Sequence, residues 1–282
     1  MKNHAVFGQH MSQCGKPVAL VLCAIAVFVA FSGIAAASQA APELFSEMLS
    51  GPIWTVIYEA ASVHPDSAHP GAFVEGTPVR ANLRLFDSAG WLIQDIAYSV
   101  DGSASVKSIT SVDGQGIPVS VLHYSGKNAL MARESIQRSA ADDGGLSFVR
   151  TVWAVDGTLT STTVVRCDRS GREISREVRT ADGVVAVTML NEYDPNGRLR
   201  SRKEYGPAGA LTTDTEWDYD QSNGLLVSEM RKGPEGEFTS TFELDLDGNW
   251  IVKRTSRMIR LQDGSVVLEP NEIIYRSITT HG

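Results

Sequence analysis

Residues 191–220 read NEYDPNGRLRSRKEYGPAGALTTDTEWDYD, and this stretch decides the predicted fold. It holds two turn signals, Asp194-Pro195-Asn196-Gly197 and Gly206-Pro207-Ala208-Gly209, separated by a segment of strand length. An aspartate at the first position of a turn accepts hydrogen bonds from nearby backbone amides, and a closing glycine supplies a positive φ. The stretch therefore predicts β-strands joined by tight turns.

The same signal recurs along the chain at a nearly constant period. An aspartate is followed by a closing glycine at Asp87–Gly90, Asp113–Gly116, Asp142–Gly145, Asp168–Gly171, Asp194–Gly197, Asp220–Gly224 and Asp245–Gly248. The seven glycines are 26, 29, 26, 26, 27 and 24 residues apart. A second set of turn glycines lies between them, at Gly102, Gly126, Gly157, Gly183, Gly209, Gly236 and Gly264. Glycine about every dozen residues disfavours helices, at a cost near ~1 kcal/mol each.

This period predicts an all-β protein, an antiparallel meander of about seven tandem β-hairpin repeats of ~26 residues each. The sheet is expected to be either open and curled or a barrel-like spiral. Four turns of the second set carry the Asp-Gly pair that is preferred by two-residue hairpin loops. These are Asp101-Gly102, Asp156-Gly157, Asp182-Gly183 and Asp263-Gly264.

Alternation within the predicted strands indicates one covered face and one wet face. Residues 210–219 place Leu211, Thr213, Thr215, Trp217 and Tyr219 on one side, and Ala210, Thr212, Asp214, Glu216 and Asp218 on the other. Such alternation is typical of a sheet that is buried on one face only. If residues 206–210 form the hairpin loop, the register places Arg198 opposite Asp218, Arg200 opposite Glu216, Arg202 opposite Asp214, Leu199 opposite Trp217 and Tyr205 opposite Leu211.

The first 40 residues differ from the rest and read as an export signal. They contain Lys2 and Lys16, no acidic residue, and an apolar run over residues 18–34 that is followed by Ser38-Gln39-Ala40. A basic start, an apolar run and a small-x-small site are typical of a cleaved signal peptide. The alternative is an uncleaved anchor. The predicted organisation is a signal peptide (1–40), lead-in strands (41–80) and a repeat domain (81–282).

Charge limits the partners that the exported part is expected to bind. The chain has 25 basic and 33 acidic residues, and removal of the signal peptide leaves a net charge of −10. This balance argues against nucleic acid and anionic membrane surfaces, because both reward clustered cations. Cys167 then remains as a lone cysteine at a repeat position that is elsewhere aromatic or aliphatic, and it is predicted to fill the core.

The repeats resemble those of bacterial tyrosine–aspartate (YD, or RHS-type) repeat proteins, in particular small exported members without an assigned activity. The resemblance rests on Tyr193-Asp194-Pro195-Asn196-Gly197-Arg198-Leu199, Tyr219-Asp220, Asp247-Gly248-Asn249-Trp250, the lead-in residues 51–56 and the closing residues 269–276. It covers most of residues 51–279. It implies a spiral or barrel-like sheet of hairpins, whereas the toxin delivery of large members is not implied for a chain of this size.

Candidate sites for chemistry are few. His64 and His69 offer two imidazoles near Asp66, but no further ligand follows in the sequence. The segment 245–249 is similar to half of a calcium loop and lacks the distal glutamate of that motif. The five tryptophans either form a strip on which sugars stack or pack in the core. They are Trp54, Trp91, Trp153, Trp217 and Trp250. The sequence therefore predicts no catalytic residue, no cofactor-binding residue, no metal site and no cofactor.

Three functions remain open from the sequence. The leading hypothesis is an exported, non-catalytic repeat protein, secreted, periplasmic or in the cell envelope, that presents an extended sheet to a protein or carbohydrate partner. The first alternative is an outer-membrane β-barrel. The second is a carbohydrate-active hydrolase or toxin-associated protein, which would need a carboxylate or histidine cluster. Contact with a membrane is expected only through the signal segment, if that segment is not cleaved.

Overall fold

The computed structural model describes residues 49, 52–69, 71–141 and 143–280. The predicted signal peptide, residues 1–40, lies outside the described residues, as does Asp142 of the third turn. All described residues belong to one compact unit. In the described ranges, no helix has the length and apolar character needed to cross a membrane.

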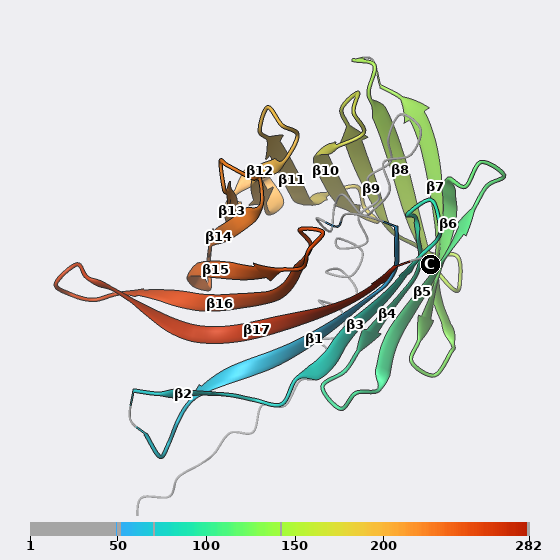
Figure 1. The fold of residues 1–282 in the computed structure, drawn as a ribbon. Coiled ribbons are helices and arrows are strands. Elements are labelled where there is room, and N and C mark those ends of the chain that lie inside the picture. Colours follow the sequence, from blue (N-terminus) through green and yellow to red (C-terminus); the bar gives the residue numbers. More distant parts are fainter. Residues whose placement is uncertain (1–48, 50–51, 70, 142, 281–282) are drawn as a thin grey trace, which may run out of the picture. The chain divides into compact units, whose positions relative to one another are not determined.

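Seventeen strands make up the described part of the chain (Figure 1). They are β1 (Ile53–Pro65), β2 (Phe73–Glu75), β3 (Val79–Phe86), β4 (Leu92–Tyr98), β5 (Ala104–Val112), β6 (Pro118–Ser125), β7 (Leu130–Ala140), β8 (Leu146–Ala154), β9 (Leu159–Cys167), β10 (Glu173–Thr180), β11 (Val185–Tyr193), β12 (Leu199–Tyr205), β13 (Leu211–Tyr219), β14 (Leu226–Gly233), β15 (Gly236–Leu244), β16 (Trp250–Arg260) and β17 (Val266–Thr280). From β3 to β17 each strand pairs antiparallel with the next, so the predicted all-β meander is confirmed.

Strand β1 closes the sheet into a barrel. Val56 lies opposite Ile278 of β17 on one side and opposite Arg84 of β3 on the other. Because β2 pairs with the far end of β1, it lies outside the ring, and sixteen of the seventeen strands close. The open curled sheet is thus wrong, since a single N-terminal strand joins both edges. Closure leaves no unpaired sheet edge around the ring.

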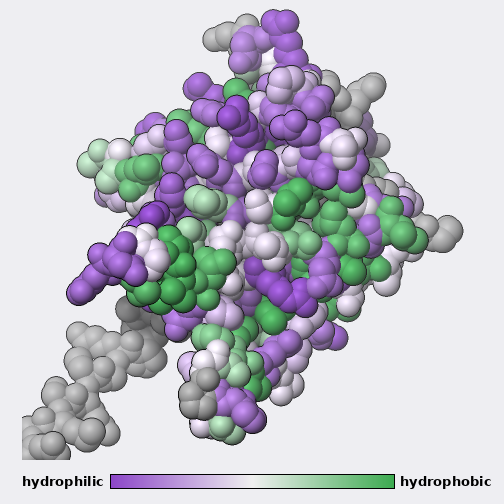
Figure 2. All heavy atoms as spheres, turned by 60° about the vertical axis from the view of Figure 1, so that its left-hand side comes forward, coloured by the Kyte–Doolittle hydropathy of each residue, from purple (hydrophilic) through white to green (hydrophobic). Residues whose placement is uncertain are grey.

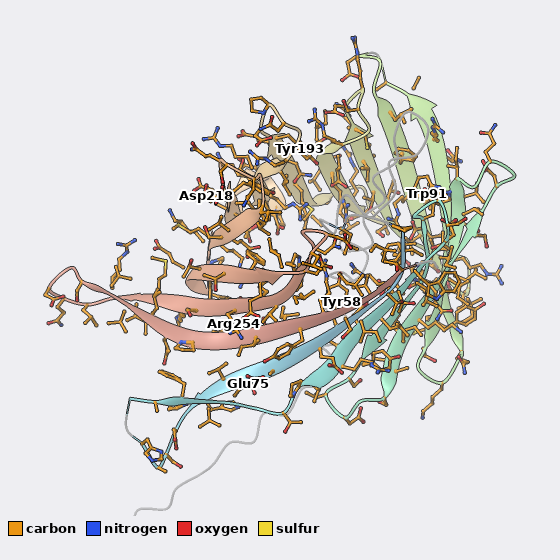
Figure 3. The ribbon with its side chains drawn as sticks, viewed as in Figure 1. Tyr58, Glu75, Trp91, Tyr193, Asp218 and Arg254 are labelled. Atoms are coloured by element: carbon orange, nitrogen blue, oxygen red, sulfur yellow. The ribbon has the colours of Figure 1, made fainter. Side chains whose placement is uncertain are left out.

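The barrel has a covered inner wall and an accessible outer wall. Directly opposed residues of paired strands project to the same side. Ile136, Arg150, Thr163 and Val178 oppose one another across β7 to β10 and are all buried. The alternate residues between them are partly exposed, so the buried side is the inside of the ring. In Figure 3, Tyr58, Trp91 and Tyr193 belong to the inner wall, and Asp218 and Arg254 to the outer wall.

Apolar packing concentrates on the inner wall near the Asp-x-x-Gly turns. One cluster contains Trp91, Val121, Ile136, Phe148, Val165 and Cys167. A second contains Leu49, Ile53, Val56, Phe86 and Leu92. Cys167 is 1% exposed in the first cluster, so its predicted role as a core residue is confirmed.

Most turns of the two sets share one geometry, whereas the Asp220–Gly224 turn is one residue longer and Gly233 pairs with Gly236 across a two-residue loop. At Asp87, the Gly90 amide donates to the Asp87 carbonyl and the Asp87 amide donates to the carbonyl of the residue after Gly90. The Asp101-Gly102 turn repeats this pattern from Ser99, with φ of 78° at Gly102. Asp-Gly pairs were predicted to make two-residue loops, and this is wrong. They make three-residue loops with a bulge, because only the glycine adopts a positive φ.

Two predicted closing glycines have a different role. The positive φ of the third Asp-x-x-Gly turn lies at Gly144 and not at Gly145, and that of the β6–β7 turn lies at Asn128 and not at Gly126. A Cβ at Gly126 or Gly145 would lie 1.7 or 2.1 Å from a backbone carbonyl oxygen of the neighbouring chain segment. Glycine is required there for close backbone approach.

A second bulge, within the strand pair, changes the register of β12 and β13. Tyr205 lies opposite Leu211 as predicted, but the register then shifts, and Arg202 lies opposite Thr215 instead of Asp214. The predicted Arg–acid pairs of this hairpin are therefore wrong. A one-residue slip exchanges the faces of a strand, and this slip places Arg202 on the inner wall. On the outer wall, Lys203 takes the position opposite Asp214.

A glycine pair in the β5–β6 turn separates backbone strain from packing. Gly116 has φ of 78° and Gly114 does not have a positive φ, and a Cβ at either would meet nothing within 4 Å. We expect Gly116→Ala to lower the free energy of unfolding by about 1–2 kcal/mol, because an L-residue is strained at that φ. Gly114→Ala is the matched control and should be neutral or slightly stabilising. Equal losses in urea unfolding of both variants would contradict this assignment.

Candidate functional site: the polar inner wall

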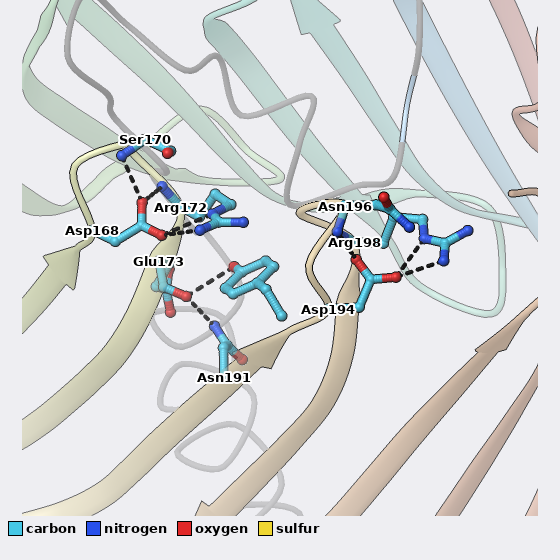
Figure 4. Close-up of polar contacts among 9 residues, drawn as sticks. Asp168, Ser170, Arg172, Glu173, Asn191, Asp194, Asn196 and Arg198 are labelled. Atoms are coloured by element: carbon cyan, nitrogen blue, oxygen red, sulfur yellow. Dashed lines mark hydrogen bonds and ion pairs between the residues drawn. The ribbon is translucent and has the colours of Figure 1, made fainter.

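In the two Asp-x-x-Gly turns of Figure 4, the aspartate side chain makes its hydrogen bonds within its own turn. Asp168 Oδ1 accepts hydrogen bonds from the backbone amides of Ser170 (2.9 Å) and Arg172 (3.0 Å). Arg172 Nε donates to Asp168 Oδ2 (2.8 Å), and its guanidinium lies 4.9 Å from the centroid of the Tyr193 ring. The Tyr193 hydroxyl donates to the carbonyl of Glu173 (2.9 Å). These contacts fasten one hairpin to the next.

The following unit repeats this fastening. Arg198 binds the Asp194 carboxylate (Nε–Oδ2, 2.7 Å) and lies 4.7 Å from the centroid of the Tyr219 ring. The Tyr219 hydroxyl donates to the Leu199 carbonyl (2.9 Å). Burial raises the pKa of Tyr219 to about 12, against the lowering effect of the Arg198 charge. The Tyr-Asp residues of these two units thus have a structural role, because their side chains bind other parts of the barrel.

The other sequence candidates do not converge on one site. His69 Nδ1 lies 2.7 Å from Asp66 Oδ2, whereas His64 Nε2 lies 2.8 Å from Ser62 Oγ. Among the described residues, no group of three or more His, Cys, Asp or Glu side chains is arranged to hold a metal ion. In the segment 245–249, Asp245 accepts hydrogen bonds from the Asp247 and Asn249 amides, which is turn chemistry.

The tryptophans form no common strip. Trp91 is buried in the first apolar cluster and Trp54 is 45% exposed. Trp217 and Trp250 lie on the inner wall, and Trp153 lies on the outer wall opposite Arg133. Trp91 is therefore a core residue, as one of the two predicted roles requires. The predicted sugar-stacking strip of five tryptophans is wrong, because the tryptophans are divided between the two walls.

A buried ionic network on β5 to β8 was missed by sequence reasoning. Glu134 is paired with Arg150, and both side chains are almost completely buried. His123 links this pair to Ser108, with Nε2 3.4 Å from Glu134 Oε2 and Nδ1 2.9 Å from Ser108 Oγ. Burial alone would raise the pKa of Glu134, but the Arg150 charge and the hydrogen bonds from His123 and Arg150 lower it to about 2. The carboxylate therefore stays charged.

This network has the connectivity of a Ser-His-acid triad, the signature that a hydrolase would need. Its surroundings differ from those of a hydrolase in two respects. Glu134 is neutralised by Arg150, and Ser108 is 6% exposed within a strand paired on both sides, where backbone amides serve the sheet instead of an oxyanion. We expect purified protein to resist covalent labelling by a fluorophosphonate, with Ser108→Ala indistinguishable from wild type. Labelling that disappears in Ser108→Ala would establish a hydrolase.

Three further ion pairs lie on the inner wall. The pairs are Arg84–Asp95 (3.5 Å), Arg176–Glu173 (2.6 Å) and Lys253–Glu229 (2.8 Å). Buried charges persist in this way because an unpaired one would carry a large desolvation penalty. The inner wall is thus polar, and these pairs neutralise much of its buried charge.

Three arginines on the inner wall of β12, β14 and β16 differ from these pairs. Arg202 Nε donates to Asn191 Oδ1 (2.9 Å), and its guanidinium lies 5.9 Å from the Trp217 ring centroid. The Arg231 guanidinium lies 4.9 Å from the ring centroid of Phe238. Arg257 Nη2 lies 3.3 Å from a backbone carbonyl oxygen. Neutral groups, not carboxylates, hold all three, and we name them the arginine row. The sequence places Arg202 on the wrong wall, which is why this row is not predicted.

Comparisons with known proteins bear on the fold only. The sequence matches no protein-family model and no curated protein. A porin-like protein from Bacteroides uniformis is similar in structure with 11% identity and a TM-score of 0.37, over 82% of this chain and 99% of that one. A porin-like protein from Bacteroides vulgatus has 13% identity and a TM-score of 0.33, over 78% and 96%. The TcdB2-TccC3 complex has 13% identity and a TM-score of 0.26, over 75% of this chain and 16% of that one.

All of these TM-scores are below 0.5, so they assign neither a family nor a function to this chain. The YD-repeat relationship remains a resemblance of sequence motifs.

Proposed function

We propose that this protein is a non-catalytic cell-envelope β-barrel that binds a polar ligand on its inner wall. The observation that carries the proposal is a closed ring whose inner wall bears charged side chains, among them three neighbouring arginines that form no ion pair in the described part of the chain. An extended open sheet, the leading hypothesis from the sequence, does not exist in this structure. We therefore assign the binding surface to the inner wall of the barrel instead of to a face of an open sheet. The predicted export signal supports the envelope location.

The outer wall supports contact with water over β10 to β16. Its charged residues are Glu177, Arg179, Glu192, Lys203, Asp214, Glu216, Asp218, Lys232, Glu237, Glu243, Arg254 and Arg260. Lys203, Asp214, Lys232 and Glu237 lie directly opposite one another on four consecutive strands, a favourable cross-strand arrangement in water. Charges on a lipid-facing wall would be unfavourable near the middle of a bilayer.

An outer-membrane barrel is the second candidate, and closure of the ring favours it. The outer wall of β1 to β6 is also more apolar than that of β10 to β16. Ile57, Leu83 and Ile96 lie opposite one another there, and Ile109 lies opposite Leu122 in a parallel row. Figure 2 shows apolar side chains gathered in patches among polar ones on one side of the molecule.

Fractionation of cells that express the full chain distinguishes the two candidates. We expect release by osmotic shock or by a salt wash, without detergent. Leu83→Lys provides a matched test, because a lysine on a lipid-facing wall would oppose insertion by about 2–4 kcal/mol at the midplane. The variant should be exported and released like the wild type. Extraction by detergent alone, together with loss of Leu83→Lys from the membrane, would establish the outer-membrane barrel instead.

A further inference from the structure

The arginine row lies along one line of cross-strand neighbours. Arg202 is opposite Thr215, which is opposite Arg231, and Phe238 continues the line to Arg257. Neighbouring strands are ~4.8 Å apart, so arginines on alternate strands are spaced by about 10 Å. The row therefore presents three cations at a regular interval along the inner wall.

The residues between the arginines form a floor. Thr215 and Phe238 are each 7% exposed, whereas Arg231 and Arg257 are exposed and Arg202 is partly buried. Arg231 is two residues from the end of β14 at Gly233, so the row reaches the rim of the barrel at the end opposite the Asp-x-x-Gly turns. A ligand entering at this rim meets the arginines above a floor of buried side chains.

The charge of the row is not cancelled by the acids nearby. Among the described residues, none of its three members forms an ion pair within 4 Å, although Glu204 follows Arg202 on the inner wall and Glu269 lies opposite Arg257. Glu229, next to Arg231 on this wall, is paired with Lys253. Arg202 Nε and Arg257 Nη2 each make one hydrogen bond within the barrel, and the other guanidinium N–H donors of the row are available to an external anion. The planar guanidinium fork matches carboxylate and sulfate groups.

We propose that the arginine row binds an extended acidic saccharide, with one acidic group at each arginine. This inference rests on the proposed function, since it names the ligand class of the inner wall. A chain molecule is favoured because cations at a regular interval match acidic groups that recur along a polymer, whereas a single small anion would engage one arginine. A saccharide also offers hydroxyl groups to the carboxylate of Glu204, which lies on the same wall.

Calorimetric titration of the purified full chain tests the proposal, with oligogalacturonate and dextran sulfate as probes and neutral dextran as the reference. The test variant carries Arg202→Gln, Arg231→Gln and Arg257→Gln. The control variant carries Arg179→Gln, Arg254→Gln and Arg260→Gln, which remove the same charge from ion-paired residues of the outer wall. We expect wild type and control to bind at least one acidic probe alike, and the test variant to bind it at least about a hundredfold more weakly.

Several outcomes would overturn the inference. Equal weakening in both variants would mean attraction by overall charge, and tight binding of neutral dextran would mean a ligand class without acidic groups. Absence of binding to both acidic probes by the wild type would also overturn it, while the fractionation result of the proposed function would be unaffected. If the triple variant does not fold, the exposed single variants Arg231→Gln and Arg257→Gln provide the test, each with an expected loss of about tenfold.

Discussion

Replacement of Glu134 by alanine is expected to lower the free energy of unfolding by about 3–5 kcal/mol. Glu134 and Arg150 are almost completely buried as a pair on the inner wall, so removal of one partner leaves the other charge buried without compensation. His123 would lose its link to the carboxylate as well. Urea unfolding followed by tryptophan fluorescence measures the loss.

Two controls isolate the buried charge as the cause. The double variant Glu134→Leu with Arg150→Met removes both charges and should recover most of the lost stability, because an apolar pair of similar volume avoids desolvation. Glu243→Ala removes the acid of an exposed outer-wall pair with Arg254 and should have little effect. A small loss in Glu134→Ala, similar to that of Glu243→Ala, would show that the network does not stabilise the barrel.

The pH dependence of stability follows from the same carboxylate. Its pKa is lowered from 4.5 to about 2 in the folded protein, so the unfolded state binds the proton more readily. The stabilisation from Glu134 is therefore complete above about pH 4.5 and is lost as the pH falls through about 2. Urea unfolding between pH 6 and pH 2 should show this acid loss in the wild type, and a smaller slope in Glu134→Gln.

The single variant Trp91→Ala is also expected to lower the free energy of unfolding, by about 3–5 kcal/mol. The indole is 1% exposed and belongs to the cluster that covers the inner wall of β6 to β9. Its loss leaves a cavity that a rigid ring of paired strands has little freedom to fill. Thermal unfolding should show a clear decrease in Tm.

Leu246→Ala is the matched control, because Leu246 is fully exposed at the tip of the last Asp-x-x-Gly turn. It should leave the unfolding curve unchanged. Trp91→Phe should lie between Trp91→Ala and the wild type, since it fills part of the space. A Trp91→Ala variant as stable as Leu246→Ala would contradict the assignment of this cluster as the main core of the barrel.

Local sequence signals determined the strands and turns of this protein. Asp168 and Asp194 make the amide contacts that their turn positions predict, because those contacts need only residues within four positions. The alternation of residues 211–219 likewise assigns Trp217 to the covered wall and Asp214 to the accessible one. Both signals depend on short-range geometry, which a single sequence records.

The tertiary structure alone decided closure, register and the candidate site. Closure depends on the pairing of β1 with β17, which joins residues more than 200 positions apart and leaves no local signature. Register depends on a bulge between Glu204 and Tyr205, where β13 contains one extra residue, and this bulge turns Arg202 from the outer wall to the inner wall. The arginine row and the Glu134 network both draw residues from separate strands. Their charges become neighbours only when the register between strands is fixed. Turn residues and alternation could therefore predict the strands of the barrel, but not the site on its inner wall.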